Sequence, residues 1–153
     1  MSLERTTSEH PSFISLVRQL DAYLANIDGD EHAFYAQYNK IAALQNVVVA
    51  THDGAPVGCG AFKPFDENTV EIKRMYVLPE WRGKGVAGRV LAELERWAVE
   101  LGYGRCVLET GLRMPDAVAV YTKKGYGRME NFGQYVGMEN SVCFEKVLPN
   151  NNC

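Results

Sequence analysis

The chain has 153 residues, 46% of them hydrophobic and 23% charged, which is the size and composition of one ordinary globular domain. Its 16 Lys and Arg residues are balanced by 19 Asp and Glu residues, so the formal net charge is −3. A chain of this charge lacks the overall basic surface with which proteins bind nucleic acid or an anionic membrane. We therefore expect a single domain over residues 1–153, with no nucleic-acid partner.

The first ten residues, MSLERTTSEH, are polar and lack the apolar segment of a signal peptide. No apolar run approaches the roughly 18 to 20 residues of a membrane-spanning helix. These features favour a cytoplasmic protein that has no membrane partner.

The four cysteines predict neither a metal site nor a redox pair. They are Cys59, Cys106, Cys143 and Cys153, without a C-x-x-C pair and without a histidine at metal-ligand spacing. Three of them lie in apolar runs typical of strands, where a thiol behaves as a small buried hydrophobic group. We expect reduced thiols and no bound metal.

The N-terminal part of the chain predicts a short strand followed by two helices. The strand is expected near residues 3–7, and apolar residues at three- and four-residue spacing predict a helix over 13–27. The sequence Asp28-Gly29-Asp30 breaks this helix. A second helix is expected over about residues 31–45, with an Asp near its N-terminus.

A hairpin is expected next. Strands over residues 47–51 and 57–62 flank Asp53-Gly54, a pair typical of tight turns, so the sheet begins antiparallel. The run VEIKRMYVL over residues 70–78 predicts a further strand, which Pro79 ends.

The C-terminal half predicts one crossover between parallel strands. An apolar stripe at helical period covers residues 86–101 and ends at Gly102. A strand over 105–109 follows, so strand, helix and strand form a right-handed crossover. A short helix over 117–124 and a final strand over about 141–147 complete the expected elements.

The sequence WRGKGVAG at residues 81–88 predicts an anion site, because its glycines have the spacing G-x-G-x-x-G and it leads into a helix. Such a loop leaves several main-chain N–H groups unpaired, and the helix dipole adds partial positive charge. Arg82 and Lys84 add full charges, while Gly83 and Gly85 let a ligand approach the main chain closely. The alternative is that these are turn and packing glycines.

Two common nucleotide sites fit this loop poorly. Glu109 lies 21 residues after Gly88, where a dinucleotide fold has its ribose-binding acid, but residues 78–82 separate the strand from the glycines and only one crossover follows. A P-loop is excluded because Lys84 is followed by Gly85, which offers no hydroxyl for magnesium.

The segment MYVLPEWRGKGVAGRVLAELERWAVELG resembles the acyl-CoA loop and helix of the GNAT superfamily of N-acetyltransferases. The pattern of that family is Gln or Arg, two residues, Gly, one residue, then Gly or Ala, and Arg82, Gly85 and Ala87 match it. The segment AVAVYTKKGY at residues 117–126 resembles the family's second hallmark, an alanine-containing helix that carries a Tyr and ends in Gly-aromatic. The resemblance covers about residues 47–148.

The resemblance implies an α/β (α+β) fold with a central mixed, mostly antiparallel, twisted sheet of about six or seven strands flanked by about four helices. Two strands would splay apart to form the acyl-CoA cleft. The resemblance also implies acetyl-CoA as acyl donor, with its pyrophosphate on the glycine loop and its pantetheine along the preceding strand. The implied cofactor-binding residues are Met75, Tyr76, Val77, Arg82, Gly83, Lys84, Gly85, Val86, Ala87 and Gly88.

The chain departs from the family at one implied cofactor contact. Many members have an Asn six residues before the Tyr of the second motif, where it bonds the pantetheine arm. Here that position is Pro115, six residues before Tyr121. This contact is therefore not expected in the same form.

Acetyl transfer to an amine needs a proton acceptor, a donor to the carbonyl oxygen and a proton donor for the leaving thiol. Glu71 resembles the family's general base by its position, and its alternative role is that of a solvated carboxylate on a strand. Tyr121 is expected as the acid, because a phenol with a pKa of about 10 can protonate a thiolate, and its alternative role is core packing. A main-chain N–H near Val77 would bond the carbonyl oxygen, and no covalent intermediate is required.

The acceptor site is expected near the first two helices, which wall the substrate cleft in this family. Asp30 and Glu31 would attract a cationic amine, unless they only cap a helix and face solvent. Tyr35 and Tyr135 are further candidates for acceptor contacts, although aromatic residues at such positions are more often packing.

The sequence thus predicts an N-acetyltransferase that moves the acetyl group of acetyl-CoA directly to a primary amine of a small molecule or amino-acid-like acceptor. A peptide or protein N-terminus or a lysine is the alternative acceptor, and a non-catalytic acyl-CoA sensor is the alternative to an enzyme. A homodimer is compatible with this prediction, because members of the family often dimerise.

Overall fold

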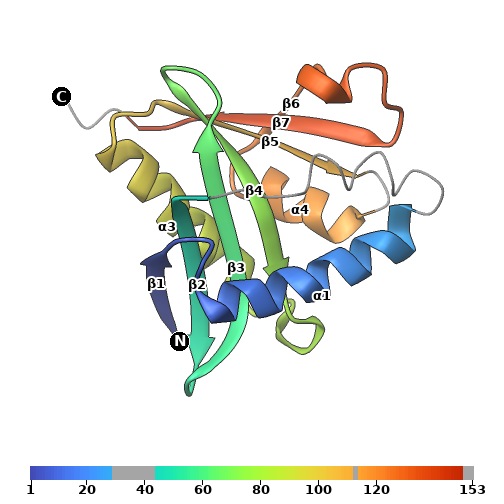
Figure 1. The fold of residues 1–153 in the computed structure, drawn as a ribbon. Coiled ribbons are helices and arrows are strands. Elements are labelled where there is room, and N and C mark those ends of the chain that lie inside the picture. Colours follow the sequence, from blue (N-terminus) through green and yellow to red (C-terminus); the bar gives the residue numbers. More distant parts are fainter. Residues whose placement is uncertain (29–43, 112–113, 150–153) are drawn as a thin grey trace. The chain divides into compact units, whose positions relative to one another are not determined.

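The computed structural model of the chain describes residues 1–28, 44–111 and 114–149. Residues 29–43, which contain most of the expected second helix, lie outside the described part. The described elements follow in the order β1 (Ser2–Thr6), α1 (Pro11–Asp28), β2 (Asn46–His52), β3 (Ala55–Pro64), β4 (Thr69–Val77), α3 (Val86–Glu100), β5 (Arg105–Gly111), α4 (Pro115–Lys123), β6 (Gly127–Met129) and β7 (Ser141–Val147) (Figure 1).

The strands form a seven-stranded mixed sheet in the order β1-β2-β3-β4-β5-β7-β6. The pairs β1–β2, β2–β3, β5–β7 and β6–β7 are antiparallel, and β4 and β5 are parallel. This confirms the expected α+β class with a mixed, mostly antiparallel sheet. No helix in the described part of the chain is long and apolar enough to cross a bilayer.

The chain divides into two compact units. The first unit consists of Met1–Lys63 and Lys73–Leu94, and the second of Pro64–Ile72 and Glu95–Cys153. Strand β4 therefore begins in the second unit and ends in the first.

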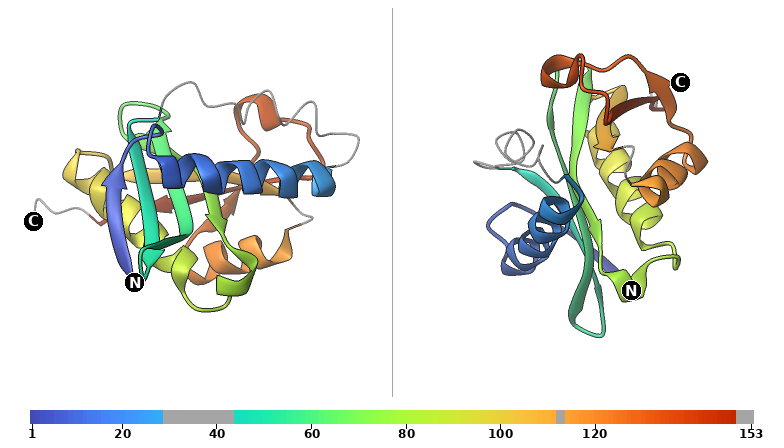
Figure 2. Two further views of the ribbon diagram at one scale, coloured as in Figure 1. Left: turned by 60° about the horizontal axis from the view of Figure 1, so that its bottom comes forward. Right: turned by 90° about the vertical axis from the view of Figure 1, so that its right-hand side faces the viewer.

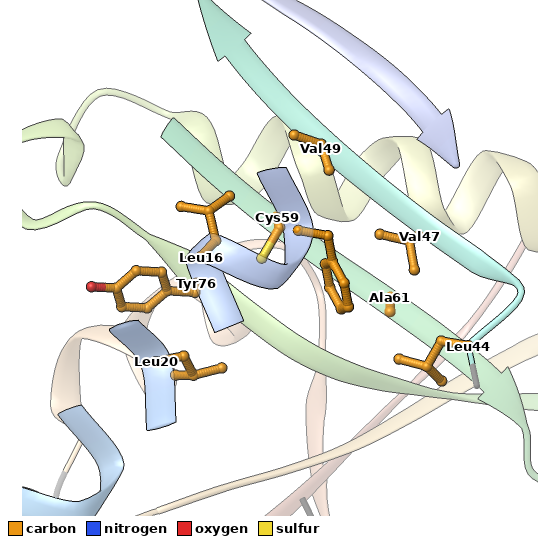
Figure 3. Close-up of a cluster of buried hydrophobic side chains, with 9 residues drawn as sticks. Leu16, Leu20, Leu44, Val47, Val49, Cys59, Ala61 and Tyr76 are labelled. Atoms are coloured by element: carbon orange, nitrogen blue, oxygen red, sulfur yellow. The ribbon is translucent and has the colours of Figure 1, made fainter. Parts of the chain in front are cut away.

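In the first unit, α1 and the N-terminal part of α3 cover opposite faces of β2 and β3 (Figure 2). Helix α1 forms because its apolar residues recur every three or four positions and give it one apolar face. That face packs on alternate residues of β2 and β3, which point to the same side of the sheet. Figure 3 shows the ring of Tyr76 between Leu16 and Leu20, with its hydroxyl directed away from the cluster. The cluster consists of Phe13, Leu16, Leu20, Leu44, Val47, Val49, Cys59, Ala61 and Tyr76.

The other face of β3 packs closely against α3 at two glycines. A Cβ on Gly58 would lie 2.7 Å from a methyl carbon of Val86. A Cβ on Gly60 would lie 2.9 Å from Leu94 Cδ1 and 3.0 Å from Val90 Cγ1, and closer still to the sulfur of a neighbouring Met. Both glycines therefore serve close packing, and they bring α3 nearer to the sheet than any other residue type would allow.

The hairpin between β2 and β3 confirms the turn expected at Asp53-Gly54. The φ angles are 51° at Asp53 and 82° at Gly54, so both central residues are left-handed. Two consecutive left-handed residues are the signature of the type I′ turn, whose twist matches that of the flanking strands.

In the second unit, β5 pairs with β7 along its whole length, and β6 extends the sheet beyond β7. The connection from α3 to β5 confirms the glycine cap expected at Gly102, whose φ is 96°. Gly104 donates its N–H to Asn68 O at 2.8 Å. The parallel pairing of β4 and β5 confirms the predicted crossover strands.

A half-buried carboxylate of α3 links β7 and the segment before β6 in the second unit. Glu95 of α3 accepts hydrogen bonds from Tyr126 Oη and from Lys146 Nζ of β7, both at 2.9 Å. Burial is the largest cause that raises the pKa of Tyr126 above its ordinary value, and nearby Glu95 and Cys106 add to it. The phenol of Tyr126 therefore stays protonated and serves as a structural donor.

The packing at Gly60 generates a stability prediction. Gly60→Ala should lower the free energy of unfolding by about 1–3 kcal/mol, because the added methyl group would collide with the side chains of Met75, Val90 and Leu94, which must shift. The measurement is urea denaturation followed by circular dichroism.

Gly127→Ala is the matched control, because Gly127 also lies in a strand and a Cβ there would meet nothing within 4 Å. Its free energy of unfolding should stay within about 0.5 kcal/mol of the parent protein. Equal losses in the two variants would contradict close packing at Gly60.

Candidate active site

The loop between β4 and α3 is a turn built on two left-handed glycines. Gly83 and Gly85 have φ angles of 78° and 84°, which residues with a Cβ rarely adopt. A 3₁₀ turn at Pro79–Trp81 precedes them, and α3 begins at Val86. Within the described residues, the N–H groups of Gly83, Lys84 and Gly85 donate no hydrogen bond to a main-chain oxygen. Together with the first N–H groups of α3, they form an array of unpaired donors at a helix N-terminus.

The two cations of the loop lie over aromatic rings. The guanidinium carbon of Arg82 is 5.1 Å from the ring centre of Tyr23 and 5.6 Å from that of Tyr76. Lys84 Nζ is 4.8 Å from a ring centre of Trp81. Aromatic faces orient these cations without neutralising their charge, so the loop keeps a positive potential.

The last residues of β4 are held by hydrogen bonds within the first unit. Val77 O accepts a hydrogen bond from Arg82 Nε at 3.0 Å, and Leu78 donates its N–H to a main-chain oxygen of β3 at 3.0 Å. The side chain of Tyr76 is buried in the core, and Met75 is half-buried on the opposite face, where its sulfur approaches β3. The main-chain N–H group expected near Val77 as donor to the acyl carbonyl oxygen is therefore not that of Leu78, which is already hydrogen-bonded.

The register of β4 and β5 brings two carboxylates to one face of the second unit. Glu71 lies opposite Val107, and Glu109 follows two residues later on β5. Side chains that lie opposite each other, or two residues apart on a strand, point to the same face. Glu71 and Glu109 therefore share a face, together with Cys143, which lies opposite Glu109 on β7. Glu71 is buried, whereas Glu109 is half-buried.

Tyr135 lies close enough to this pair of carboxylates to feel their charge. It ends a 3₁₀ turn at Gly133–Tyr135 and is only 2% exposed. Burial raises the pKa of the Tyr135 phenol above its ordinary value, and the negative charges of Glu109 and Glu71 raise it further. The amide nitrogen of Asn131 lies 3.0–3.1 Å from three main-chain oxygens of this loop and so fixes its path. The structure thus brings Tyr135 together with Glu71, as two of the expected site residues.

Tyr121 lies on the buried side of α4. Its ring centre is 5.9 Å from that of Tyr126 and 6.3 Å from that of Phe144. Burial raises the pKa of the Tyr121 phenol above its ordinary value, and the carboxylate of Glu109 adds to this effect. The phenol therefore keeps its proton throughout the physiological range and is available as a donor.

Comparison with known proteins assigns the chain to a family. The sequence profile of the Acetyltransferase (GNAT) family matches residues 13–126. The chain is a GNAT-family acetyltransferase. It is 30% identical to the IAA acetyltransferase of Azospirillum brasilense over 156 aligned positions, which cover 97% of this chain and 98% of that protein.

Solved structures agree with this assignment. A protein of Klebsiella pneumoniae described as an acyl-CoA N-acyltransferase superposes with a TM-score of 0.80 and 30% identity, covering 97% of each chain. An aminoglycoside 6′-N-acetyltransferase complexed with coenzyme A superposes with a TM-score of 0.72 and 16% identity, covering 98% of this chain and 99% of that one. At that identity the likeness concerns the fold alone.

Helix α4 of the acetyltransferase begins at Pro115, the residue that departs from the family pattern. The preceding Met114 makes no side-chain cap. Proline at this position fixes a helical φ and needs no hydrogen-bond acceptor. Because its ring has no polar atom, the implied amide contact to pantetheine cannot come from this side chain.

Three of the expected acceptor residues lie outside the described part of the chain, and the structure adds two residues to those expected. Asp30, Glu31 and Tyr35 lie outside the described residues, so their acceptor role stays a prediction. From the sequence, Glu109 is a candidate only for a ribose-binding acid, whereas the strand register places it on the same face as Glu71. The sequence has no pattern that distinguishes Arg74, which has a left-handed main chain with φ of 58° and a buried guanidinium.

The described thiols of the acetyltransferase are free and buried, as expected. Burial raises the pKa of Cys59 and of Cys106 to about 12, and that of Cys143 to about 11. A thiol with such a pKa is protonated at neutral pH and is a poor nucleophile. Within the described residues, no group of three or more His, Cys, Asp or Glu side chains could hold a metal ion.

The raised pKa of Cys59 generates a pH-dependent stability prediction. Below pH 9 the thiol is protonated in both the folded and the unfolded chain, so its contribution to stability is complete. Between about pH 9 and 12 only the unfolded chain releases this proton, and stability falls. The loss from this one group between pH 8 and pH 10.5 should be about 2 kcal/mol.

Cys59→Ala removes this titration and should make the fall in unfolding free energy between pH 8 and pH 10.5 smaller by that amount. Urea denaturation at the two pH values gives the change in unfolding free energy for the parent and for the variant. Comparing these two changes cancels any loss of stability that the smaller side chain causes equally at both pH values. Parallel falls in the parent and the variant would show that the buried thiol does not titrate differently on unfolding.

Proposed function

We propose that this acetyltransferase moves the acetyl group of acetyl-CoA directly to the primary amine of a small-molecule or amino-acid-like acceptor. The observation that carries the proposal is the turn at Gly83 and Gly85, whose unpaired N–H groups stand at the N-terminus of the 15-residue helix α3. Helix N-termini bind phosphate groups, because their N–H groups and the helix dipole both favour negative charge. The structure of an acetyltransferase of the same fold with coenzyme A supports the same cofactor here.

The loop offers room for a diphosphate. A Cβ on Gly83 or Gly85 would meet no described atom within 4 Å, so the main chain is open to a ligand on this side. Arg82 and Lys84 add two positive charges beside the N–H groups. The main-chain edge of β4 at Met75, Tyr76 and Val77 is the proposed track for the pantetheine arm, and Val86, Ala87 and Gly88 complete the phosphate site. When bound, acetyl-CoA supplies the thioester whose C–S bond breaks as the new C–N bond forms.

Glu71 and Glu109 are proposed to receive the acceptor amine. An alkyl ammonium has a pKa of about 10.4, so fewer than about one molecule in a thousand is neutral at pH 7. Two carboxylates on one sheet face attract the cationic form, and Glu71 takes a proton from it directly or through water, which leaves a nucleophilic amine. Tyr135 keeps its own proton beside them, because burial and the two carboxylates raise its pKa.

Tyr121 is proposed to give its proton to the leaving thiolate. Its raised pKa keeps the phenol protonated at the working pH. A high pKa makes a phenol a weaker acid, but a thiolate that forms in the same dry surroundings is also a stronger base than in water. Proton donation at this point prevents the thiolate from attacking the new amide.

The proposed role of Tyr121 generates a kinetic prediction. Tyr121→Phe should lower kcat for amine-dependent thiol release from acetyl-CoA by about 10²- to 10⁴-fold, because the hydroxyl that protonates the thiolate is lost. The dissociation constant of acetyl-CoA should stay within about threefold, since the ring remains. A colorimetric thiol assay and calorimetry measure the two quantities.

Tyr126→Phe is the matched control, because its ring packs against Tyr121 while its hydroxyl bonds to Glu95. This variant should lose stability and keep kcat within a few-fold of the parent protein. An unchanged kcat in Tyr121→Phe would show that another group protonates the thiol.

A further inference from the structure

Arg74 is a buried arginine whose hydrogen-bonding capacity is not met by the described residues. Its side chain is only 4% exposed. Nη2 donates to Asp21 Oδ1 of α1 at 2.7 Å. Nε and Nη1 are buried and have no hydrogen-bond partner in the described part of the chain. One side of the guanidinium is thus paired, and the rest of its donors are directed at no acceptor.

Buried donors of a charged group that lack hydrogen-bond partners lower the stability of the folded protein. A buried donor without a partner loses its hydration and gains nothing in exchange, and the loss is larger when the group is charged. Buried arginines therefore almost always have their donors satisfied. A ligand that supplies the missing acceptors would remove this cost on binding.

The main chain of Arg74 is strained as well. Its φ of 58° lies in the left-handed region, which is uncommon for a residue with a long side chain. Its carbonyl oxygen accepts a hydrogen bond from Cys59 Sγ at 3.5 Å on the neighbouring strand, which helps to hold this conformation. Strained residues of this kind cluster at binding and catalytic sites, where the surrounding structure maintains them.

The guanidinium lies just beneath the surface of the first unit. Its partner Asp21 is 52% exposed, although the two side chains are in direct contact. Because Nε and Nη1 are themselves buried, a ligand reaches them only if side chains beside Asp21 move aside. Because Asp21 is solvated, it compensates the charge of Arg74 only in part.

We propose that Arg74 binds a carboxylate of the acceptor, so that the acceptor is an amine that also carries a carboxylate group, as amino acids do. This inference rests on the proposed function, because it assigns the acceptor class of the same reaction. Arg74 belongs to β4, the strand that also carries the proposed base Glu71.

A carboxylate fits these observations better than other anions. The planar guanidinium presents pairs of parallel N–H groups that match the two oxygens of a carboxylate. A carboxylate adds only one negative charge beside Arg74 and Asp21. A doubly charged phosphate would leave excess negative charge in a buried place, which is unfavourable.

The test compares matched acceptors with the full-length protein. Each pair consists of an amino acid and the amine that remains when its carboxyl group is removed, such as L-phenylalanine and 2-phenylethylamine. Thiol release from acetyl-CoA gives kcat/KM for each acceptor, expressed per neutral amine so that the different amine pKa values cancel. Across a panel of side chains, the best amino acid should exceed its decarboxylated partner by about 10- to 100-fold.

The same ratio is then measured in variants. Arg74→Lys keeps a positive charge but loses the paired donors, and Arg74→Gln loses the charge. Both should bring the ratio to within about threefold of one, with the KM for acetyl-CoA unchanged. Arg18→Gln is the matched control, because Arg18 is an exposed arginine on α1, and it should keep the parent ratio.

The outcomes separate this inference from the proposed function. If the parent protein acetylates each amino acid and its decarboxylated partner with equal kcat/KM, the proposed role of Arg74 is wrong, and the proposed acetyltransferase function is unaffected. The absence of turnover with every amine would overturn the proposed function and this inference with it. The ratio in the parent protein does not depend on whether the Arg74 variants fold.

Discussion

The proposed chemistry depends on how closely α3 packs against β3. Gly58 and Gly60 have no side chains, so Val86, Val90 and Leu94 of the helix come into direct contact with the strand. This contact fixes the N-terminus of α3, and with it the turn at Gly83 and Gly85 whose N–H groups are unpaired. Two glycines in a strand thus position two glycines in a loop, and neither pair could be replaced without strain or collision.

The second unit carries the groups proposed for acid–base catalysis. Strand register places Glu71 and Glu109 on one face, and their negative charges act on the phenol of Tyr135. Burial keeps Tyr121 protonated as well. The proposed acetylation of an amine needs both kinds of group, because one group must accept a proton while another donates one.

Much of the fold follows from local sequence patterns, and most of the site does not. The apolar stripe of α3, the Asp53-Gly54 turn and the strand Ser141–Val147 were all predictable, since periodicity and turn chemistry are encoded by neighbouring residues. Strand β6 is three residues long and too short to show alternation. The proposed roles of Glu109 and Arg74 depend on strand register and on a main-chain angle, which arise only when distant segments pair. The glycine loop and the helix after it were predictable, because they are contiguous in the sequence, whereas the role of the loop as a phosphate site stays a prediction.

The most direct test of the account is a crystal structure of the protein with acetyl-CoA bound. We expect the pyrophosphate oxygens to lie about 2.7–3.2 Å from main-chain nitrogens within residues 83–88, at ordinary hydrogen-bond distance. A saturated crystal in which the cofactor lies elsewhere, or in which these N–H groups are bonded to the protein's own atoms, would contradict the central claim.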